Sequence, residues 1–74
     1  MIDKSKEHLI HVTEALADFC RKEYNCTIKI DWINDDVGNL YINKKLIKKE
    51  QPYVCIYYGV VWFHWDMMHK YSKD

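Results

Sequence analysis

A segment near the start of the chain, from about Asp3 to Tyr24, contains neither proline nor glycine and repeats apolar side chains at steps of three and four residues. This spacing predicts one amphipathic helix, whose apolar stripe the rest of the chain must cover. The side chain of Asp3 or Ser5 can cap its first turn. Because the whole chain has only 74 residues, we expect a single domain, residues 1–74, with a small core. The predicted stripe consists of Leu9, Val12, Leu16, Phe19 and Glu23 or Tyr24, widened by Ala15 and Cys20.

Two segments after this helix alternate apolar and polar residues, which predicts half-buried β-strands. The first covers residues 27–33 and the second covers residues 40–43. The turn-forming residues 34–39 between them make the pair a β-hairpin. Residues 44–51 either extend the second strand or lead around to a third. We expect that third strand at residues 53–58, directly after Pro52, because its side chains favour β-structure.

The last part of the chain has two interpretations. Either residues 60–65 form a fourth strand and residues 66–72 a turn, or a helix runs from about Val61 to Tyr71. The inner face of that helix would carry Val61, His64 or Trp65, Met68 and Tyr71. His69 and Lys70 favour the helix, because basic side chains suit a helix C-terminus. The predicted fold class is then α+β in the order α-β-β-β-α: a small two-layer domain with the N-terminal helix packed on a three-stranded antiparallel sheet, followed by a short C-terminal helix. The expected dry face of the sheet comprises Ile28, Ile30, Trp32, Leu40, Ile42, Val54 and Ile56.

Composition disfavours a membrane or secreted protein. No apolar run approaches the roughly 18 residues of a membrane helix, and the first residues lack the apolar core of a signal peptide. Three cysteines are an odd number, which predicts free thiols in a reducing compartment. We therefore expect a cytoplasmic protein. Abundant Lys, Ile, Asn and Tyr with scarce Arg, Gly, Pro and Ala indicate an AT-rich genome, such as that of a low-GC bacterium or its phage.

The histidines and cysteines do not have the spacing of a metal site, since no Cys-x-x-Cys pair is present. A nucleophilic Cys55 with His64 or His69 as base and Asp66 as third member is conceivable. Its place in an apolar segment argues instead for a buried, unreactive thiol. We therefore expect no catalytic residues, no metal, no cofactor and no enzymatic activity.

A lysine-rich stretch supports an alternative function, the binding of a nucleic acid or nucleotide. Lysines there can contact phosphate while nearby Tyr or Trp rings stack on bases. The element order also resembles that of double-stranded-RNA-binding domains, although the basic helix start of those domains is replaced here by residues 62–66. The zero net charge argues against this function. The residues of this alternative are Lys44, Lys45, Lys48 and Lys49.

Aromatic side chains crowd into the last 22 residues, in larger number than a small core can cover. We expect Tyr53, Tyr57 and one of Trp62 or Trp65 to face outward, although a core that takes up all the rings is the competing explanation. Exposed Tyr and Trp clusters are typical of protein interfaces. The expected partner-binding residues are Tyr53, Tyr57, Tyr58, Trp62, Trp65 and Tyr71.

The sequence as a whole predicts a non-enzymatic protein–protein interaction module. We expect its partner to be a host or cellular protein and the chain to self-associate, as a homodimer or other homo-oligomer, through the aromatic C-terminal half. A phage- or mobile-element-encoded inhibitor of a host protein fits the chain length and composition. Neither a membrane nor a cofactor enters this prediction.

Overall fold

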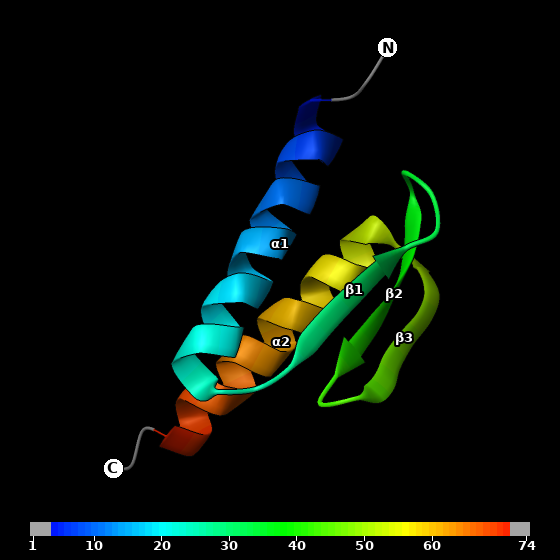
Figure 1. The fold of residues 1–74 in the computed structure, drawn as a ribbon. Coiled ribbons are helices and arrows are strands. Elements are labelled where there is room, and N and C mark those ends of the chain that lie inside the picture. Colours follow the sequence, from blue (N-terminus) through cyan, green and yellow to red (C-terminus); the bar gives the residue numbers. More distant parts are fainter. Residues whose placement is uncertain (1–3, 72–74) are drawn as a thin grey trace.

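The computed structural model describes residues 4–71, with the side chain of residue 71 left aside. Its elements follow the predicted order α-β-β-β-α, and the three strands form an antiparallel sheet in the order β1-β2-β3 (Figure 1). The predicted fold class is therefore confirmed. The elements are α1 (Lys4–Tyr24), β1 (Ile28–Trp32), β2 (Val37–Ile42), β3 (Lys45–Pro52) and α2 (Tyr53–Tyr71).

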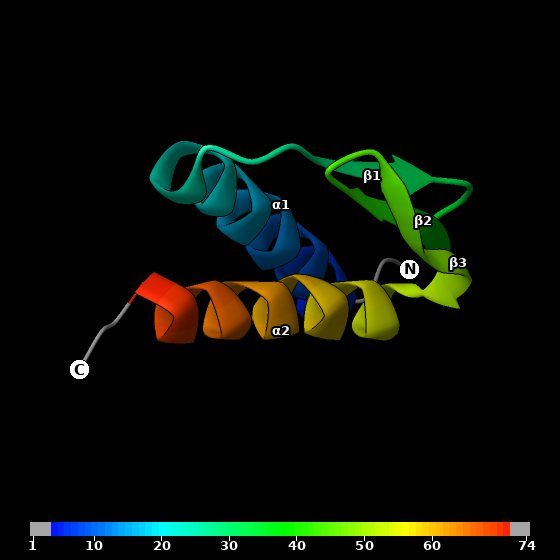
Figure 2. The ribbon, with the colours of Figure 1, turned by 90° about the horizontal axis from the view of Figure 1, so that it is seen from below.

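Both helices pack against the sheet. Figure 1 shows α1 alongside β1, with α2 behind them. Figure 2 shows α2 along one side of the molecule, with α1 and the sheet both lying against it. Helix α2 contacts α1, β2 and β3, whereas α1 contacts β1. Most of the dry face is thus covered by the C-terminal helix, a role that the sequence assigned to the N-terminal one.

The core lies where both helices meet the sheet. Its one buried polar residue among those described is Thr13, whose Oγ1 donates a hydrogen bond to the Leu9 carbonyl at 2.7 Å. Small side chains at this centre of α1 allow α2 to pack closely. The buried apolar residues are Ala17, Cys20, Ile28, Leu40, Ile42, Ile56 and Val60.

The inner face of α1 is rotated from the predicted stripe. Ala17 and Cys20 are fully buried, whereas Phe19, expected on the inner face, is 46% exposed, and Ala15 is exposed as well. The helix ends as expected at Tyr24. The next residue has φ 53°, the left-handed conformation with which helices commonly end.

The third strand predicted at residues 53–58 is wrong. Those residues begin α2, and the third strand is the lysine-rich segment before them. A two-residue turn at Asn43 and Lys44 reverses the chain between β2 and β3, and both residues have positive φ, 52° and 69°. Such turns match the twist of a tight hairpin. Asn43 tolerates positive φ and favours such a turn, but Lys44 does not, and the turn was not identified from the sequence.

The helical interpretation of residues 61–71 is confirmed, and the fourth strand at residues 60–65 is absent from the described chain. The helix is longer than expected, because it begins at Tyr53, directly after Pro52. Ile56 and Val60 are completely buried on its inner side, one helical turn apart. Burial of this face against the sheet outweighs the β-propensity of the segment.

Three polar contacts fix both helices to the β1–β2 hairpin. Trp32 Nε1 donates to Glu14 Oε2 at 2.7 Å, which joins β1 to α1. Lys6 Nζ forms an ion pair with Asp36 in the hairpin loop. The backbone N–H of Tyr53 donates to the Asp36 carbonyl at 2.8 Å. One loop thus holds the start of both helices and contributes to the orientation of α2.

Neither helix of the described chain combines the length and apolar character needed to cross a bilayer.

Candidate protein-interaction surface

Helix α2 carries apolar side chains on two opposite sides. Its inner side contributes Ile56 and Val60 to the core. Its outer side carries large apolar residues at steps of four, four, three and three positions, which places them along one exposed band of the helix. A helix that is apolar all round is normally buried all round. We call the outer band the apolar stripe; it consists of Val54, Tyr58, Trp62, Trp65 and Met68, which are 37%, 55%, 63%, 49% and 43% exposed.

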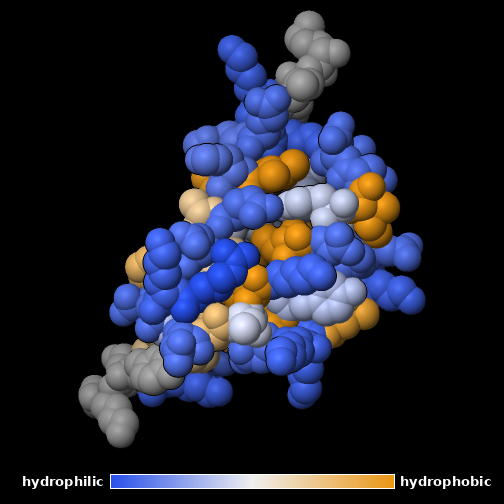
Figure 3. Space-filling model, viewed as in Figure 1, coloured by the Kyte–Doolittle hydropathy of each residue, from blue (hydrophilic) through white to orange (hydrophobic). Residues whose placement is uncertain are grey.

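The direction of the apolar stripe follows from the way α2 sits on the sheet. Gly59 packs against Leu40 of β2, and its lack of a side chain lets the helix come close. Residues 56, 60 and 63 then face inward, so residue 62 on the opposite side must face outward. In the view of Figure 3, where α1 and the sheet face the reader, hydrophilic side chains cover much of the surface and apolar side chains show between α1 and the sheet.

The rings of the apolar stripe pack against one another. Trp62 and Trp65 meet edge to face, with ring centroids 5.4 Å apart and an interplanar angle of 81°. Trp65 also packs against His69, with ring centroids 4.1 Å apart. Edge-to-face contact is a favourable arrangement for aromatic pairs. These contacts hold the rings in place at the surface, which lowers the entropy cost of binding a partner there.

A groove of about 490 Å³ runs between α2 and β3 beside the apolar stripe. Its floor is apolar, and Ile47 of β3 stands 46% exposed at its wall. Lys48 from the strand and Asp66 from the helix supply one charge of each sign. The groove widens the exposed apolar surface from one helix face to the adjoining sheet edge. Its lining residues are Ile42, Ile47, Lys48, Gly59, Trp62, Phe63, Trp65 and Asp66.

The predicted partner-binding residues are distributed over two sides of α2. Tyr58 lies on the apolar stripe, next to the half-buried Tyr57, with ring centroids 5.6 Å apart. Tyr53, also half-buried, lies under the ammonium group of Lys6 at 5.6 Å. Tyr71 is the last residue of α2, and its side chain lies outside the described part. The outward orientation expected of Tyr53 and Tyr57 therefore holds only in part.

Three exposed residues of this surface were not among the predicted partner-binding residues. Val54 was assigned to the dry face of the sheet and Met68 to the inner face of the C-terminal helix, and both are exposed; Ile47 was not considered for binding. No local signal could have found Val54, because its exposure depends on residues 53–58 being helical. Ile47 lies at a register shift of the edge strand β3, where it has no Cα partner on β2, and its side chain is exposed.

The lysines of the nucleic-acid alternative lie in the β2–β3 turn and on β3. Lys44 occupies the turn and Lys45 begins the strand. Lys48 is the cross-strand neighbour of the buried Leu40 and therefore lies on the side that faces α2. Successive side chains of a strand point to opposite faces, which directs Lys49 away from α2. The ammonium groups are thus divided between two faces of the sheet.

The residues considered for nucleophilic chemistry do not come together. Cys55 and His64 are nine positions apart on one continuous helix, which places them on opposite sides and about 13 Å apart along its axis. His69 is farther still along the same axis. The Nδ1 atom of His64 lies 3.0 Å from the Tyr24 hydroxyl, in the contact between the two helices. The imidazole is therefore engaged in packing α1 against α2.

The thiols near the end of α1 have the properties of core residues. Burial raises the pKa of Cys20 to about 11, and the neighbouring Cys26 adds to this shift. Burial also raises the pKa of Cys26, whose thiol donates to the Cys20 carbonyl at 3.4 Å. Both groups are neutral thiols at physiological pH, so neither is an activated nucleophile.

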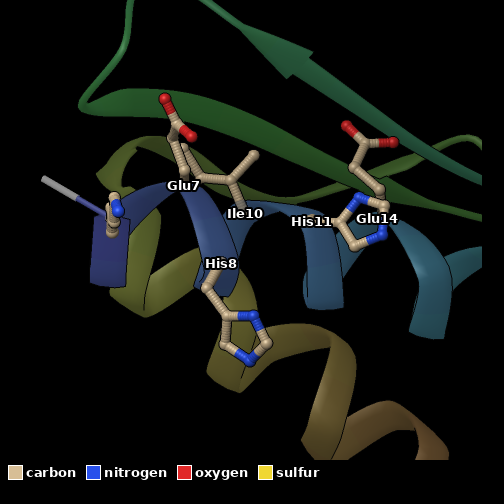
Figure 4. A pocket seen from close by; sticks show the side chains of 6 residues that line it. Glu7, His8, Ile10, His11 and Glu14 are labelled. Atoms are coloured by element: carbon tan, nitrogen blue, oxygen red, sulfur yellow. The ribbon is translucent and has the colours of Figure 1, made fainter. Parts of the chain in front are cut away.

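A second hollow, of about 570 Å³, lies on the surface of α1. All its lining residues come from this one helix. Figure 4 shows the carboxylates of Glu7 and Glu14 on one side, while the His8 ring points the opposite way. The donors therefore do not converge on a point where an ion could bind. Within residues 4–71 no group of three or more His, Cys, Asp and Glu side chains has the arrangement of a metal site.

Comparisons of the chain with models of known protein families, with curated proteins and with solved structures find no match.

Proposed function

We propose that this protein is a protein-binding module whose binding surface is the apolar stripe together with the adjoining groove. The observation that carries the proposal is the position of Trp62. It lies at the middle of the stripe, is 63% exposed and packs against a second exposed tryptophan. Tryptophan is one of the residue types enriched among the few central residues that contribute most of the binding energy of an interface.

The size of the surface supports this function. A large aromatic side chain carries about 150–250 Å², so the three half-exposed rings of the stripe together offer roughly 300 Å². Val54, Met68 and Ile47 extend this area. The largest exposed apolar patch on a monomeric protein is roughly 300–600 Å² and is often functional. The stripe reaches that range in a chain of only 74 residues.

The outer edge of β3 is a less suitable docking site than the apolar stripe. Its pairing with β2 is interrupted by register shifts, and Glu50 has a positive φ of 48°. Lys45 and Lys49 also lie exposed on this strand. Irregular backbone and lysine side chains both discourage the addition of another strand. Binding through the helix face needs no free backbone groups.

Site-specific photo-crosslinking tests the proposal. A photoreactive amino acid is placed at position 62, and in a control protein at position 22, where the lysine on α1 is 79% exposed. The two proteins are irradiated in cells, and adducts are identified by mass spectrometry. We expect discrete protein adducts from position 62 and only background from position 22. Equal labelling from both positions, or none from either, contradicts the proposal.

A further inference from the structure

We infer that the occupant of the apolar stripe is a second copy of this chain, bound with its α2 antiparallel to the first about a two-fold axis near Trp62. This inference rests on the proposed function, because it names the partner of the same surface. It is carried by the arrangement of the charged groups beside the stripe. In a two-fold interface, every group must meet its complement on the same surface.

The apolar stripe is nearly symmetrical about Trp62. Tyr58 precedes it by four residues and Trp65 follows it by three. With a rise of about 1.5 Å per residue, these rings lie roughly 6 Å and 5 Å on either side of it along the helix. In an antiparallel pair the two Trp62 side chains meet at the axis, and Tyr58 of each copy lies opposite the Trp65 region of the other. The apolar surface is therefore complementary to itself.

Two opposite charges flank the stripe on its sheet side. Asp66 lies four residues after Trp62. The methylene stem of Lys48 crosses Gly59, since a Cβ atom at residue 59 would lie 3.6 Å from both its Cγ and Cε atoms. Lys48 therefore lies beside α2 about three residues before Trp62. Among the described residues, neither Lys48 nor Asp66 forms an ion pair.

The two-fold axis brings these charges together. The two copies of α2 are related by a 180° rotation about an axis perpendicular to the plane that contains both helices. This rotation reverses the direction of the helix and keeps the sheets of both copies on the same side of that plane. Asp66 of one copy then lies at the level of Gly59 of the other, where the Lys48 stem of that copy runs. Each dimer contains this pair twice. A parallel two-fold arrangement would instead put the sheets of the two copies on opposite sides of the plane of the helices, so that neither Lys48 nor Asp66 would meet an opposite charge of the other copy.

The charge of the whole chain also favours self-association. Its formal net charge is zero and its pI is about 6.9, so two copies do not repel each other at neutral pH. A net charge near zero promotes association, whereas a large one keeps copies apart.

Sedimentation equilibrium over a wide range of protein concentration tests the inference, with charge reversal as the specific probe. We expect a monomer–dimer equilibrium that Trp62→Ala abolishes. Lys48→Asp and Asp66→Lys should each raise the dimer dissociation constant by at least about tenfold, since each places two like-charge pairs in the interface. The double variant Lys48→Asp/Asp66→Lys should recover the wild-type constant to within about threefold. Lys22→Asp on α1 is the matched control and should change little.

The outcomes separate this inference from the proposed function. A chain that stays monomeric at all concentrations, or a dimer unaffected by Trp62→Ala, overturns the inference. If Trp62→Ala abolishes the dimer but neither charge reversal changes the dissociation constant, the antiparallel arrangement is wrong. The apolar stripe then remains the binding surface. If the crosslinked adducts contain another protein and not a second copy of this chain, the proposed function is supported and the self-pairing is wrong.

Discussion

Gly59 of α2 packs directly against Leu40 of β2: a Cβ atom at residue 59 would lie only 2.6 Å from Leu40 Cδ2. Leu40 is fully buried at the centre of the sheet, so its side chain has little room to move. This contact brings the helix onto the sheet and sets its rotation. The same rotation turns Trp62 to the outside, so a core contact determines which residues are available for binding.

Gly59→Ala should destabilise the protein by about 1 kcal/mol, even though alanine favours a helix over glycine by about the same amount. The added methyl group must displace the buried Leu40 side chain, and overpacking of this kind costs roughly 1–3 kcal/mol. Urea unfolding followed by circular dichroism measures the change. In a Leu40→Ala background the clash is gone, so Gly59→Ala should there be stabilising. A stabilising effect of Gly59→Ala in the wild-type background would show that the helix is not held by this contact.

Trp62→Ala should change the free energy of unfolding by less than about 0.5 kcal/mol, as is usual for exposed positions. Trp32→Ala should cost about 2 kcal/mol or more, because its ring packs against the core and Gly38 and its Nε1 atom donates to Glu14. Both variants are unfolded at a protein concentration below that of self-association. A larger loss for Trp62→Ala than for Trp32→Ala would mean that the exposed ring serves the core.

Lys44→Gly should stabilise the protein by up to about 1 kcal/mol. Lys44 has φ 69°, a left-handed conformation that costs a side-chain-bearing residue roughly 1–2 kcal/mol and glycine almost nothing. Part of that gain is lost to the greater freedom of glycine in the unfolded chain. Thermal unfolding measures the effect, with Lys49→Gly as control, which should destabilise because that residue lies within β3. Loss of stability in Lys44→Gly would contradict the turn geometry.

Stability should fall as the pH rises from about 9 to about 11. The Cys20 thiol in the unfolded chain ionises near its ordinary pKa of 9.0, whereas burial raises the pKa in the folded protein to about 11. Between these values the unfolded state binds fewer protons, so rising pH favours unfolding. Burial also raises the pKa of Tyr24 and Cys26, which acts in the same direction.

Urea titrations at pH 8, 9, 10 and 11 measure this slope. Cys20→Ala removes the ionisable group and should give a shallower decline with pH, whatever its effect on stability at pH 8. An unchanged slope in this variant would assign the alkaline sensitivity to other groups.

Local patterns were sufficient for the first half of the fold. Residues 4–24 alternate between an apolar and a charged side at helical period, and residues 28–42 alternate at strand period around a polar turn. Both patterns are carried by neighbouring residues, so they can be identified without knowledge of the partner elements. The turn at Asn43 and Lys44 was not identified in this way, because Asn43 is followed by a lysine and not by the glycine that usually completes such a turn.

The sequence by itself determined the first helix, the hairpin and an excess of large rings at the C-terminal end. It predicted the order α-β-β-β-α, but it placed the third strand at residues 53–58 and left the last element open between a strand and a helix. It could not decide the structure of residues 53–58 or which rings face outward. Those residues are apolar on nearly every side, so they have no periodicity that separates a helix from a strand. Only the tertiary structure decided this, because the sheet of three strands left an apolar face that a helix at Tyr53–Tyr71 covers. The rotation of that helix, set at Gly59, then assigned Ile56 and Val60 to the core and Trp62 to the surface.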